Sequence, residues 1–144
     1  MGNLNIAINT EILDLLTKIK FKHMGRDESG LDCSGFVYFF YKLQGIELPI
    51  YDEGINYSEK WEDEDADRLE RILEKISKII PDNKKKVGNI LCFRIRHNKI
   101  NHLGIYIGNE KFLHSFMKFG VSISNLNHFW LRTLKEIREI NRNG

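Results

Sequence analysis

The stretch Gly30-Leu31-Asp32-Cys33-Ser34-Gly35-Phe36-Val37-Tyr38-Phe39-Phe40-Tyr41 decides the fold. Small and polar residues come first, and an almost unbroken apolar run follows as far as Leu43. Apolar side chains around most of a helix's circumference indicate a buried helix, so the pattern predicts a helix from about Cys33 to Gln44. Gly45 then ends it, since glycine readily takes the left-handed conformation found at helix C-termini.

A cysteine that opens a buried helix can serve as a nucleophile. The N–H groups at the helix N-terminus favour a negative charge, so they favour the thiolate of Cys33. Ser34 and Gly35 are small and leave room for a substrate. An ordinary buried helix cysteine is the alternative, and Cys33 alone does not distinguish the two. Cys92 lies between Leu91 and Phe93 in an apolar strand and is predicted to be a core residue. A single disulfide between the two cysteines stays open.

The remaining elements place helices before strands. Apolar spacing predicts a helix over residues 10–20 with Thr10 as N-cap, a loop over 20–31, irregular chain over 46–62 with Pro49 and Gly54, and a long helix over about 64–79. β-branched and aromatic runs predict strands at 90–95, 102–107, 112–116, 121–123 and 135–140. We therefore expect residues 1–144 to form one α+β domain with an antiparallel sheet.

Acidic residues gather at 61–65, in Trp-Glu-Asp-Glu-Asp. At the start of the predicted long helix they complement the helix dipole, and we expect this helix to face solvent. The alternative is that these carboxylates bind a metal ion, but we expect no metal and no cofactor.

Five histidines could act as a base. Three lie in polar surroundings and are predicted to be surface residues: His23, His97 and His128. His102 and His114 flank one predicted hairpin, which favours a Cys–His–His set with Cys33. Side chains alternate along a strand, so a plain two-residue turn would put these two histidines on opposite faces. The hairpin should therefore contain a bulge or an odd loop near residues 108–111.

Composition excludes several classes of protein. The chain has 144 residues, of which 42% are hydrophobic and 29% charged, as in a folded globular domain. Its net charge of +2 is too small to indicate nucleic-acid binding. The longest apolar run, residues 36–41, is far shorter than the ~20 residues of a membrane span, so we expect no membrane insertion. The N-terminus lacks the pattern of a signal peptide, so we expect synthesis in the cytoplasm and delivery by other means.

Four segments resemble the signatures of NlpC/P60 peptidases. Residues 30–37, Gly-Leu-Asp-Cys-Ser-Gly-Phe-Val, resemble the motif around the family's nucleophile. Residues 101–109, Asn-His-Leu-Gly-Ile-Tyr-Ile-Gly-Asn, and 112–115, Phe-Leu-His-Ser, resemble its two histidine strands. Residues 88–93, Gly-Asn-Ile-Leu-Cys-Phe, resemble a further strand. Together these resemblances cover residues 21–124, and order, spacing and residue types agree at three separate places.

The resemblance implies a papain-like α+β fold and hydrolysis of peptidoglycan stem peptides, typically between D-γ-glutamyl and a diamino acid. It implies Cys33 as nucleophile, His102 as base and His114 as the residue that orients this base. Phe21, Asp32 and Ser34 would fall in the substrate site. The family usually has Tyr where Phe21 stands, a Gly-Gly pair where Met24-Gly25 stands, and Asp where Asn89 stands. The missing Tyr hydroxyl bears on the substrate site or the oxyanion hole.

Residues 57–80, with Trp61 before the predicted long helix, resemble an insertion in the phage-type branch of the family. That resemblance implies association with a virion or with phage tail proteins. Two alternatives remain beside the wall peptidase. One is a structural tail-tip component with weak or no hydrolase activity. The other is an acyltransferase or amidase on the same fold, although such relatives often have His before Cys, and here Cys33 precedes His102.

Overall fold

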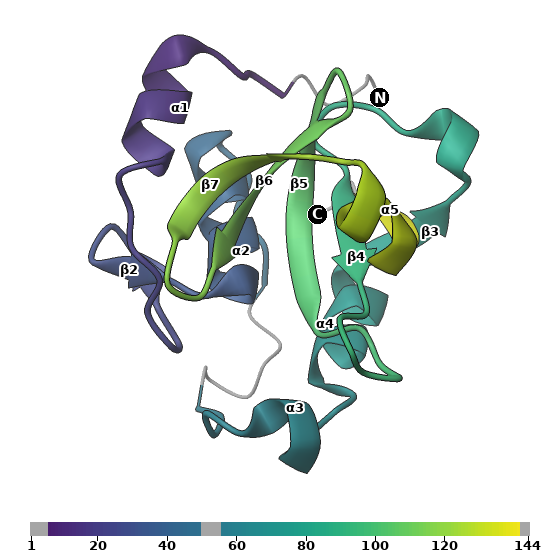
Figure 1. The fold of residues 1–144 in the computed structure, drawn as a ribbon. Coiled ribbons are helices and arrows are strands. Elements are labelled where there is room, and N and C mark those ends of the chain that lie inside the picture. Colours follow the sequence, from purple (N-terminus) through teal and green to yellow (C-terminus); the bar gives the residue numbers. More distant parts are fainter. Residues whose placement is uncertain (1–5, 50–55, 142–144) are drawn as a thin grey trace.

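Six antiparallel strands form the centre of the fold, in the order β3-β8-β4-β5-β6-β7 (Figure 1). The computed structural model describes residues 6–49 and 56–141. The strands of this sheet are β3 Ser77–Ile80, β4 Ile90–Phe93, β5 His102–Gly108, β6 Lys111–Phe116, β7 Gly120–Asn125 and β8 Leu134–Ile140. The helices are α1 Thr10–Leu16, α2 Cys33–Leu43, α3 Trp61–Glu64, α4 Arg68–Ile76 and α5 His128–Thr133, with a 3-10 turn η2 at Asp82–Lys84. A two-stranded hairpin, β1 Arg26–Asp27 and β2 Gly30–Leu31, precedes α2.

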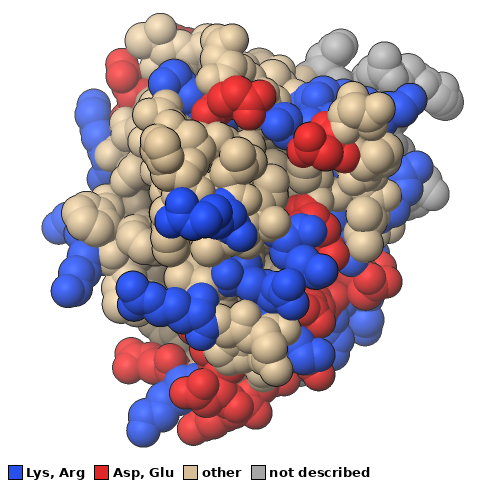
Figure 2. All heavy atoms as spheres, turned by 45° about the vertical axis from the view of Figure 1, so that its right-hand side comes forward, with Lys and Arg blue, Asp and Glu red and all other residues tan. Residues whose placement is uncertain are grey.

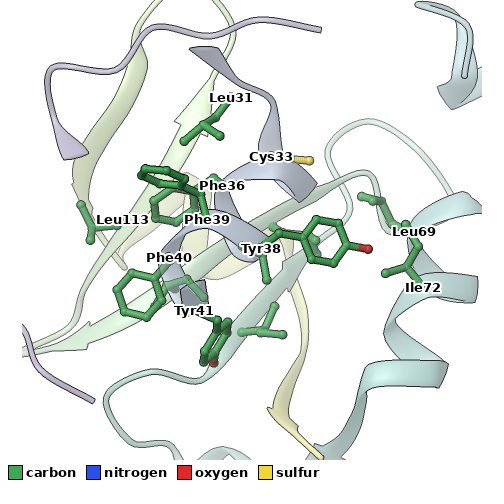
Figure 3. Close-up of a cluster of buried hydrophobic side chains, with 14 of the residues drawn as sticks. Leu31, Cys33, Phe36, Tyr38, Phe39, Phe40, Tyr41, Leu69, Ile72 and Leu113 are labelled. Carbon is green, nitrogen blue, oxygen red and sulfur yellow. The ribbon is translucent and has the colours of Figure 1, made fainter. Parts of the chain in front are cut away.

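The two faces of the sheet carry separate apolar clusters. α2 packs on one face, where Phe36 and Phe40 meet Leu103, Ile105 and Leu113 (Figure 3). On the other face, a smaller cluster lies beneath α5 and its partly buried Trp130; its buried members are Leu91, Phe93, Tyr106, Phe112, Leu126 and Ile137. This helix-on-antiparallel-sheet arrangement confirms the predicted α+β class.

Helix α2 begins at Cys33 as predicted and ends at Leu43. Gly45 has a φ of 81°, the left-handed conformation expected just past the helix. Cys92 is fully buried in β4, so the prediction of a core residue is confirmed. Both cysteines are free thiols, and no disulfide joins them.

Three other predictions need correction. The N-cap of α1 is Asn9, not Thr10, and the segment 20–31 contains the β1–β2 hairpin. The predicted long helix over 64–79 is broken, because α3 ends at Glu64, α4 runs only to Ile76, and β3 follows. Residues 77–80 leave the helix because all four of them pair with residues 137–140 of β8. Gly54 and the start of the chain lie outside the described residues.

No helix among the described residues combines the length and apolar character that crossing a membrane requires.

Candidate active site

Cys33 is the first residue of α2, and Asp32 is the N-cap. The Asp32 carboxylate accepts the backbone N–H of Gly35 at 2.8 Å, which fixes the first turn of the helix. The Cys33 sulfur points away from the packed rings of α2 (Figure 3). It therefore lies at the positive end of the helix dipole, although Cys33 itself belongs to the buried cluster on this face of the sheet.

Cys33 and His102 both line one cleft, which has a volume of about 640 Å³. Residues 21–23, the region of α3 and α4, the start of β5 and the end of β6 contribute its walls. The backbone N–H of Leu103 donates to the Cys33 sulfur, so the thiol lies against the strand residue that follows His102. The nucleophile and the base predicted from the sequence thus share one site.

His102 and His114 contact each other directly. Nε2 of His102 lies 2.7 Å from Nδ1 of His114, and Nε2 of His114 lies 2.8 Å from the Ser124 hydroxyl. A consistent proton assignment has His102 Nε2–H donating to His114, and His114 Nε2–H donating to Ser124. This assignment leaves Nδ1 of His102 without a proton, and that atom can accept the proton of a thiol.

A bulge in the β5–β6 hairpin makes the histidine contact possible. Ile105 pairs with Leu113 and Tyr106 with Phe112, but Gly108 pairs with Lys111, so the register shifts by one residue between Tyr106 and Gly108. The turn residues Asn109 and Glu110 both have positive φ, as in a type I′ turn. The extra residue restores the parity that puts both histidines on one face, which confirms the predicted bulge.

Aromatic side chains enclose the histidine pair. The Trp130 ring of α5 lies 5.6 Å from the His102 ring and 4.9 Å from the His114 ring, between centroids. Phe116 lies 5.4 Å from His102 on the same side. His102 is 6% exposed and His114 1% exposed. The site therefore holds its imidazoles in a largely water-free environment.

Burial of the two imidazoles and of the Cys33 thiol shifts the pKa of each group. Burial lowers the pKa of His102 well below its usual value, and His114 lowers it further. Burial likewise lowers the pKa of His114, to about 4. Burial, followed by the charge of Asp32, raises the pKa of Cys33 to about 12, while Arg68 and the Leu103 N–H act in the opposite direction. Both shifts favour the uncharged forms, a neutral thiol at Cys33 and a neutral imidazole at His102, in the cleft that the two side chains line.

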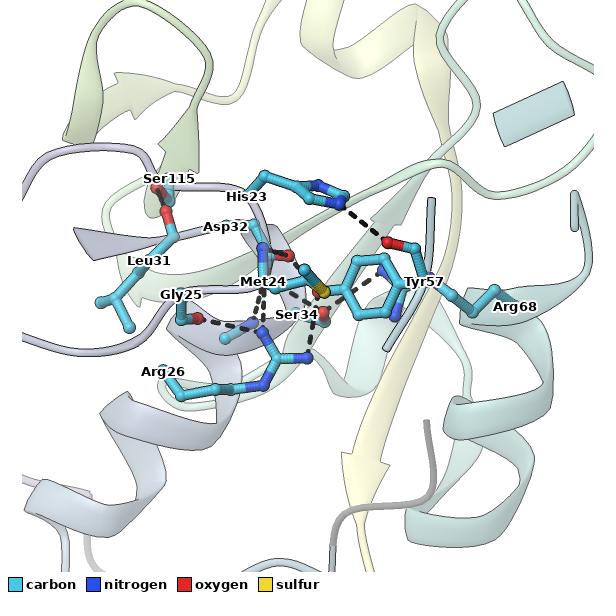
Figure 4. Close-up of polar contacts among 11 residues, drawn as sticks. His23, Met24, Gly25, Arg26, Leu31, Asp32, Ser34, Tyr57, Arg68 and Ser115 are labelled. Atoms are coloured by element: carbon cyan, nitrogen blue, oxygen red, sulfur yellow. Dashed lines mark hydrogen bonds and ion pairs between the residues drawn. The ribbon is translucent and has the colours of Figure 1, made fainter. Parts of the chain in front are cut away.

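Asp32 lines the cleft and also holds a polar cluster beneath it (Figure 4). Its carboxylate accepts the backbone N–H of Met24 at 3.0 Å, forms a 3.0 Å ion pair with Arg26, and accepts the hydroxyl of Tyr57. These contacts tie the segment before α2 to the residues after it, so the carboxylate positions the nucleophile turn.

The other two predicted substrate residues are placed differently. Phe21 lines the cleft, and its backbone bridges to Leu31. Ser34 is 1% exposed, and its hydroxyl donates to Asp32 at 3.2 Å and accepts from Arg68 at 3.4 Å. Ser34 thus lies beneath the cleft and Phe21 in its wall.

Sequence reasoning missed several residues of this site. His23 was predicted to lie at the surface, but it is half-buried and lines the cleft, with Nε2–H donating to the Tyr57 carbonyl at 2.9 Å. Glu62 was predicted only as part of the acidic start of a solvent-facing helix, and it lines the cleft from its exposed rim together with Glu59. The position of His23 is fixed by a hydrogen bond to a residue 34 positions away, and no local sequence pattern indicates such a contact. A signal for Ser124 was present, since Ser122 and Ser124 alternate on the strand beside His114.

Figure 2 shows acidic side chains at the lower end of the molecule, where α3 carries Glu62, Asp63 and Glu64. Lys and Arg are spread over the middle of the same face. Within residues 6–49 and 56–141, no three His, Cys, Asp or Glu side chains are grouped so as to hold a metal ion. The acidic segment therefore contributes a charged rim to the cleft.

Comparison with known proteins agrees with this geometry. The model of the NlpC/P60 family matches residues 18–139, which span both histidine strands and the nucleophile turn. The chain belongs to the NlpC/P60 family. Two crystal structures show that the fold of this NlpC/P60 chain has close counterparts. An NLP/P60-family protein of Staphylococcus aureus aligns with a TM-score of 0.65 at 20% identity over 92% of this chain and 40% of that one. The NlpC/p60 domain of peptidoglycan hydrolase SagA aligns with a TM-score of 0.61 at 18% identity over 90% of this chain and 92% of that one.

Curated relatives are similar over shorter parts of their own length. The Escherichia coli protein "Murein DD-endopeptidase MepS/Murein LD-carboxypeptidase" is 27% identical over 94% of this NlpC/P60 chain and 65% of its own length. A probable endopeptidase NlpC homolog of Haemophilus influenzae is 32% identical over 84% of the chain and 55% of its own length. The gamma-D-glutamyl-L-lysine dipeptidyl-peptidase of Bacillus subtilis is 35% identical over 67% of the chain and 27% of its own length. This chain thus spans less than two thirds of these relatives.

Proposed function

We propose that this NlpC/P60 chain is a cysteine endopeptidase that cuts an amide bond in the stem peptide of peptidoglycan, between D-γ-glutamyl and a diamino acid. The observation that carries the proposal is the joint placement of Cys33 and His102 in one cleft, with His102 hydrogen-bonded to His114. The names of the relatives support the substrate class, since they are murein endopeptidases and a γ-D-glutamyl-L-lysine peptidase.

The proposed reaction begins with transfer of the Cys33 thiol proton to Nδ1 of His102. The sulfur attacks the carbonyl carbon, and the carbonyl oxygen becomes an oxyanion near the Cys33 backbone N–H at the start of α2. His102 then gives its proton to the leaving amine, and the C–N bond breaks to leave a thioester. Water, deprotonated by His102, hydrolyses the thioester and returns the thiol.

His114 and Ser124 support the imidazolium that forms during this cycle. His114 accepts a hydrogen bond from His102 Nε2–H and passes one to the Ser124 hydroxyl. The two bonds hold the ring with Nδ1 toward the cleft and delocalise the transient positive charge. Because both imidazoles are buried, each bond acts in a low local dielectric.

Cleavage of the glycan strand is the reaction that the site supports least. It requires a pair of carboxyl groups that flank the sugar bond, one of them desolvated enough to stay protonated. The carboxylates at the cleft rim, Glu59 and Glu62, are both exposed to solvent. Cys33 and its imidazole occupy the enclosed part instead.

A pair of model substrates tests which bond is cut. One is the tripeptide L-Ala-γ-D-Glu-diaminopimelate, and the other is a cross-linked peptide that joins D-Ala to diaminopimelate. We expect release of L-Ala-D-Glu from the tripeptide and no cleavage of the cross-link. Cleavage of the cross-link alone would replace the proposed bond with the one named for the Escherichia coli relative.

A structural role in a phage tail tip is the second candidate, and Phe21 favours it, since this cleft residue lacks the hydroxyl that the family usually has there. Inertness of the folded wild-type chain toward both peptides and whole wall would favour this role. We propose a phage or prophage origin on the resemblance of residues 57–80, although α3 and α4 are shorter than the predicted helix. Tail genes beside the coding sequence would support this origin, and their absence would remove it.

A further inference from the structure

A buried arginine forms part of the wall of the cleft. Arg68, the first residue of α4, is 1% exposed and lines the same space as Cys33 and His102. Its guanidinium carbon lies 3.6 Å from the centre of the Tyr57 ring and 4.5 Å from that of Trp61. Its Nη2 donates to the hydroxyl of Ser34 at 3.4 Å, and Ser34 is the neighbour of the nucleophile (Figure 4). The aromatic rings thus hold a positive charge beneath the nucleophile turn.

We propose that Arg68 is the cation that stabilises the thiolate of Cys33, and that it acts through the interior of the protein without touching substrate. Its burial decides between this role and direct substrate binding. A guanidinium with 1% exposure offers almost no surface to a ligand. Its field nevertheless reaches the sulfur, because the intervening medium is protein and not water.

The other charges around Cys33 make such a cation useful. The Asp32 carboxylate next to the thiol and the more distant Glu62 both raise the pKa of Cys33, whereas Arg68 lowers it. Arg68 therefore acts on the sulfur in the direction that favours the thiolate. Besides Arg68, the titratable groups that line the cleft around the thiol are Lys22, His23, Asp32, Glu59, Glu62 and His102.

The inference rests on the proposed function, since a thiolate matters only for a thiol nucleophile, but its test needs no peptidoglycan. The rate at which iodoacetamide labels Cys33 is measured by peptide mapping from pH 7 up to the highest pH at which the protein stays folded, and the midpoint of the profile is taken from a fit of the rate against pH. We expect R68Q to move the midpoint of this profile upward by roughly half to one pH unit. R68K keeps the charge and should keep the midpoint close to that of the wild type.

R71Q is the matched control, because it removes the same charge from the same helix. Arg71 pairs with Asp65 at 2.8 Å and lines a different hollow of the surface. We expect R71Q to leave the midpoint unchanged. An unchanged midpoint in R68Q would overturn the inference, as would an equal shift in R71Q. Near-ultraviolet circular dichroism shows whether R68Q folds. If R68Q does not fold, the test rests on R68K alone. A shift of the labelling midpoint by half a pH unit or more in R68K would contradict a role for the positive charge at this position.

Failure of this inference differs visibly from failure of the proposed function. A protein that cuts the model tripeptide but shows no shift in R68Q keeps its function and loses the role of Arg68. A protein that cuts neither peptide but shows the shift keeps the role of Arg68 and loses the proposed substrate.

Discussion

Cys33 and Cys92 are both buried thiols, and the groups around each sulfur separate them. Cys33 is 7% exposed in the cleft beside His102, whereas Cys92 is fully enclosed in β4. Burial raises the pKa of both thiols, but of the two only Cys33 shares a cleft with His102 and lies at a helix N-terminus, which favours the thiolate.

We therefore expect brief iodoacetamide treatment at neutral pH to label Cys33 much faster than Cys92. Peptide mapping by mass spectrometry measures both rates in one sample. Cys92→Ala serves as the control and should label at the wild-type rate. Equal labelling of the two cysteines would contradict the assignment of the nucleophile.

The histidine pair predicts graded effects of substitution. His102→Ala removes the base and should lower kcat by about 10²–10⁴. His114→Ala should lower it less, because His114 orients the base and moves no proton to or from substrate. Ser124→Ala should have the smallest effect, since it removes only the last bond of the series. Steady-state kinetics on the model tripeptide measures all three, and a reversed order would refute the assigned roles.

The start of α2 depends on close contact with the segment before it. A Cβ on Gly35 would lie 1.9 Å from the Gly25 carbonyl oxygen and 2.9 Å from Nη1 of Arg26. Backbone atoms cannot yield at such a distance, so any larger residue must push the 25–26 segment off the helix. The shift would carry Asp32 and the nucleophile turn with it.

Gly35→Ala should therefore destabilise the protein by about 1–3 kcal/mol or more and abolish activity. Gly45→Ala is the matched control, because a Cβ there meets nothing within 4 Å and only the φ of 81° is unfavourable. We expect it to cost about 1 kcal/mol and to leave kcat unchanged. Urea denaturation and kinetics measure both variants. A fully active Gly35→Ala protein would show that the close contact is dispensable.

Sequence patterns predicted the elements whose cause is local. The apolar run and Gly45 define α2 locally, and side-chain parity required a bulge between His102 and His114. The prediction of one long helix was wrong, because residues 77–80 pair with β8, some 60 positions away. This pairing outweighed the helical spacing of their apolar side chains. His23 and Arg68 could not be assigned to the cleft, since both depend on Tyr57 for their surroundings.

At the scale of the whole molecule, the buried histidines link folding to pH. The pKa of His114 is about 4 in the fold, against a usual value of 6.5. Between these values the unfolded chain binds a proton that the folded chain does not, so the free energy of unfolding falls as the pH falls from 6.5 to 4. The His114 contribution amounts to about 3 kcal/mol over this window, and His102 acts in the same direction.

Urea titrations at pH 7, 5.5 and 4.5 measure this loss. His114→Asn cannot gain the proton, so we expect its free energy of unfolding to depend less on pH than that of the wild type. Subtracting the two series removes the contribution of carboxylates, which titrate in both proteins. Identical slopes would show that His114 is protonated in the fold and that the neutral hydrogen-bonded pair is wrong.

The most direct test of the central claim is digestion of purified bacterial cell wall, followed by mass spectrometry of the soluble fragments. We expect the wild-type protein and Cys92→Ala to release fragments cut within the stem peptide, with glycan strands intact. Cys33→Ala should fold normally and lose activity by several orders of magnitude. New reducing sugar ends with intact stem peptides, or full activity of Cys33→Ala, would contradict the account.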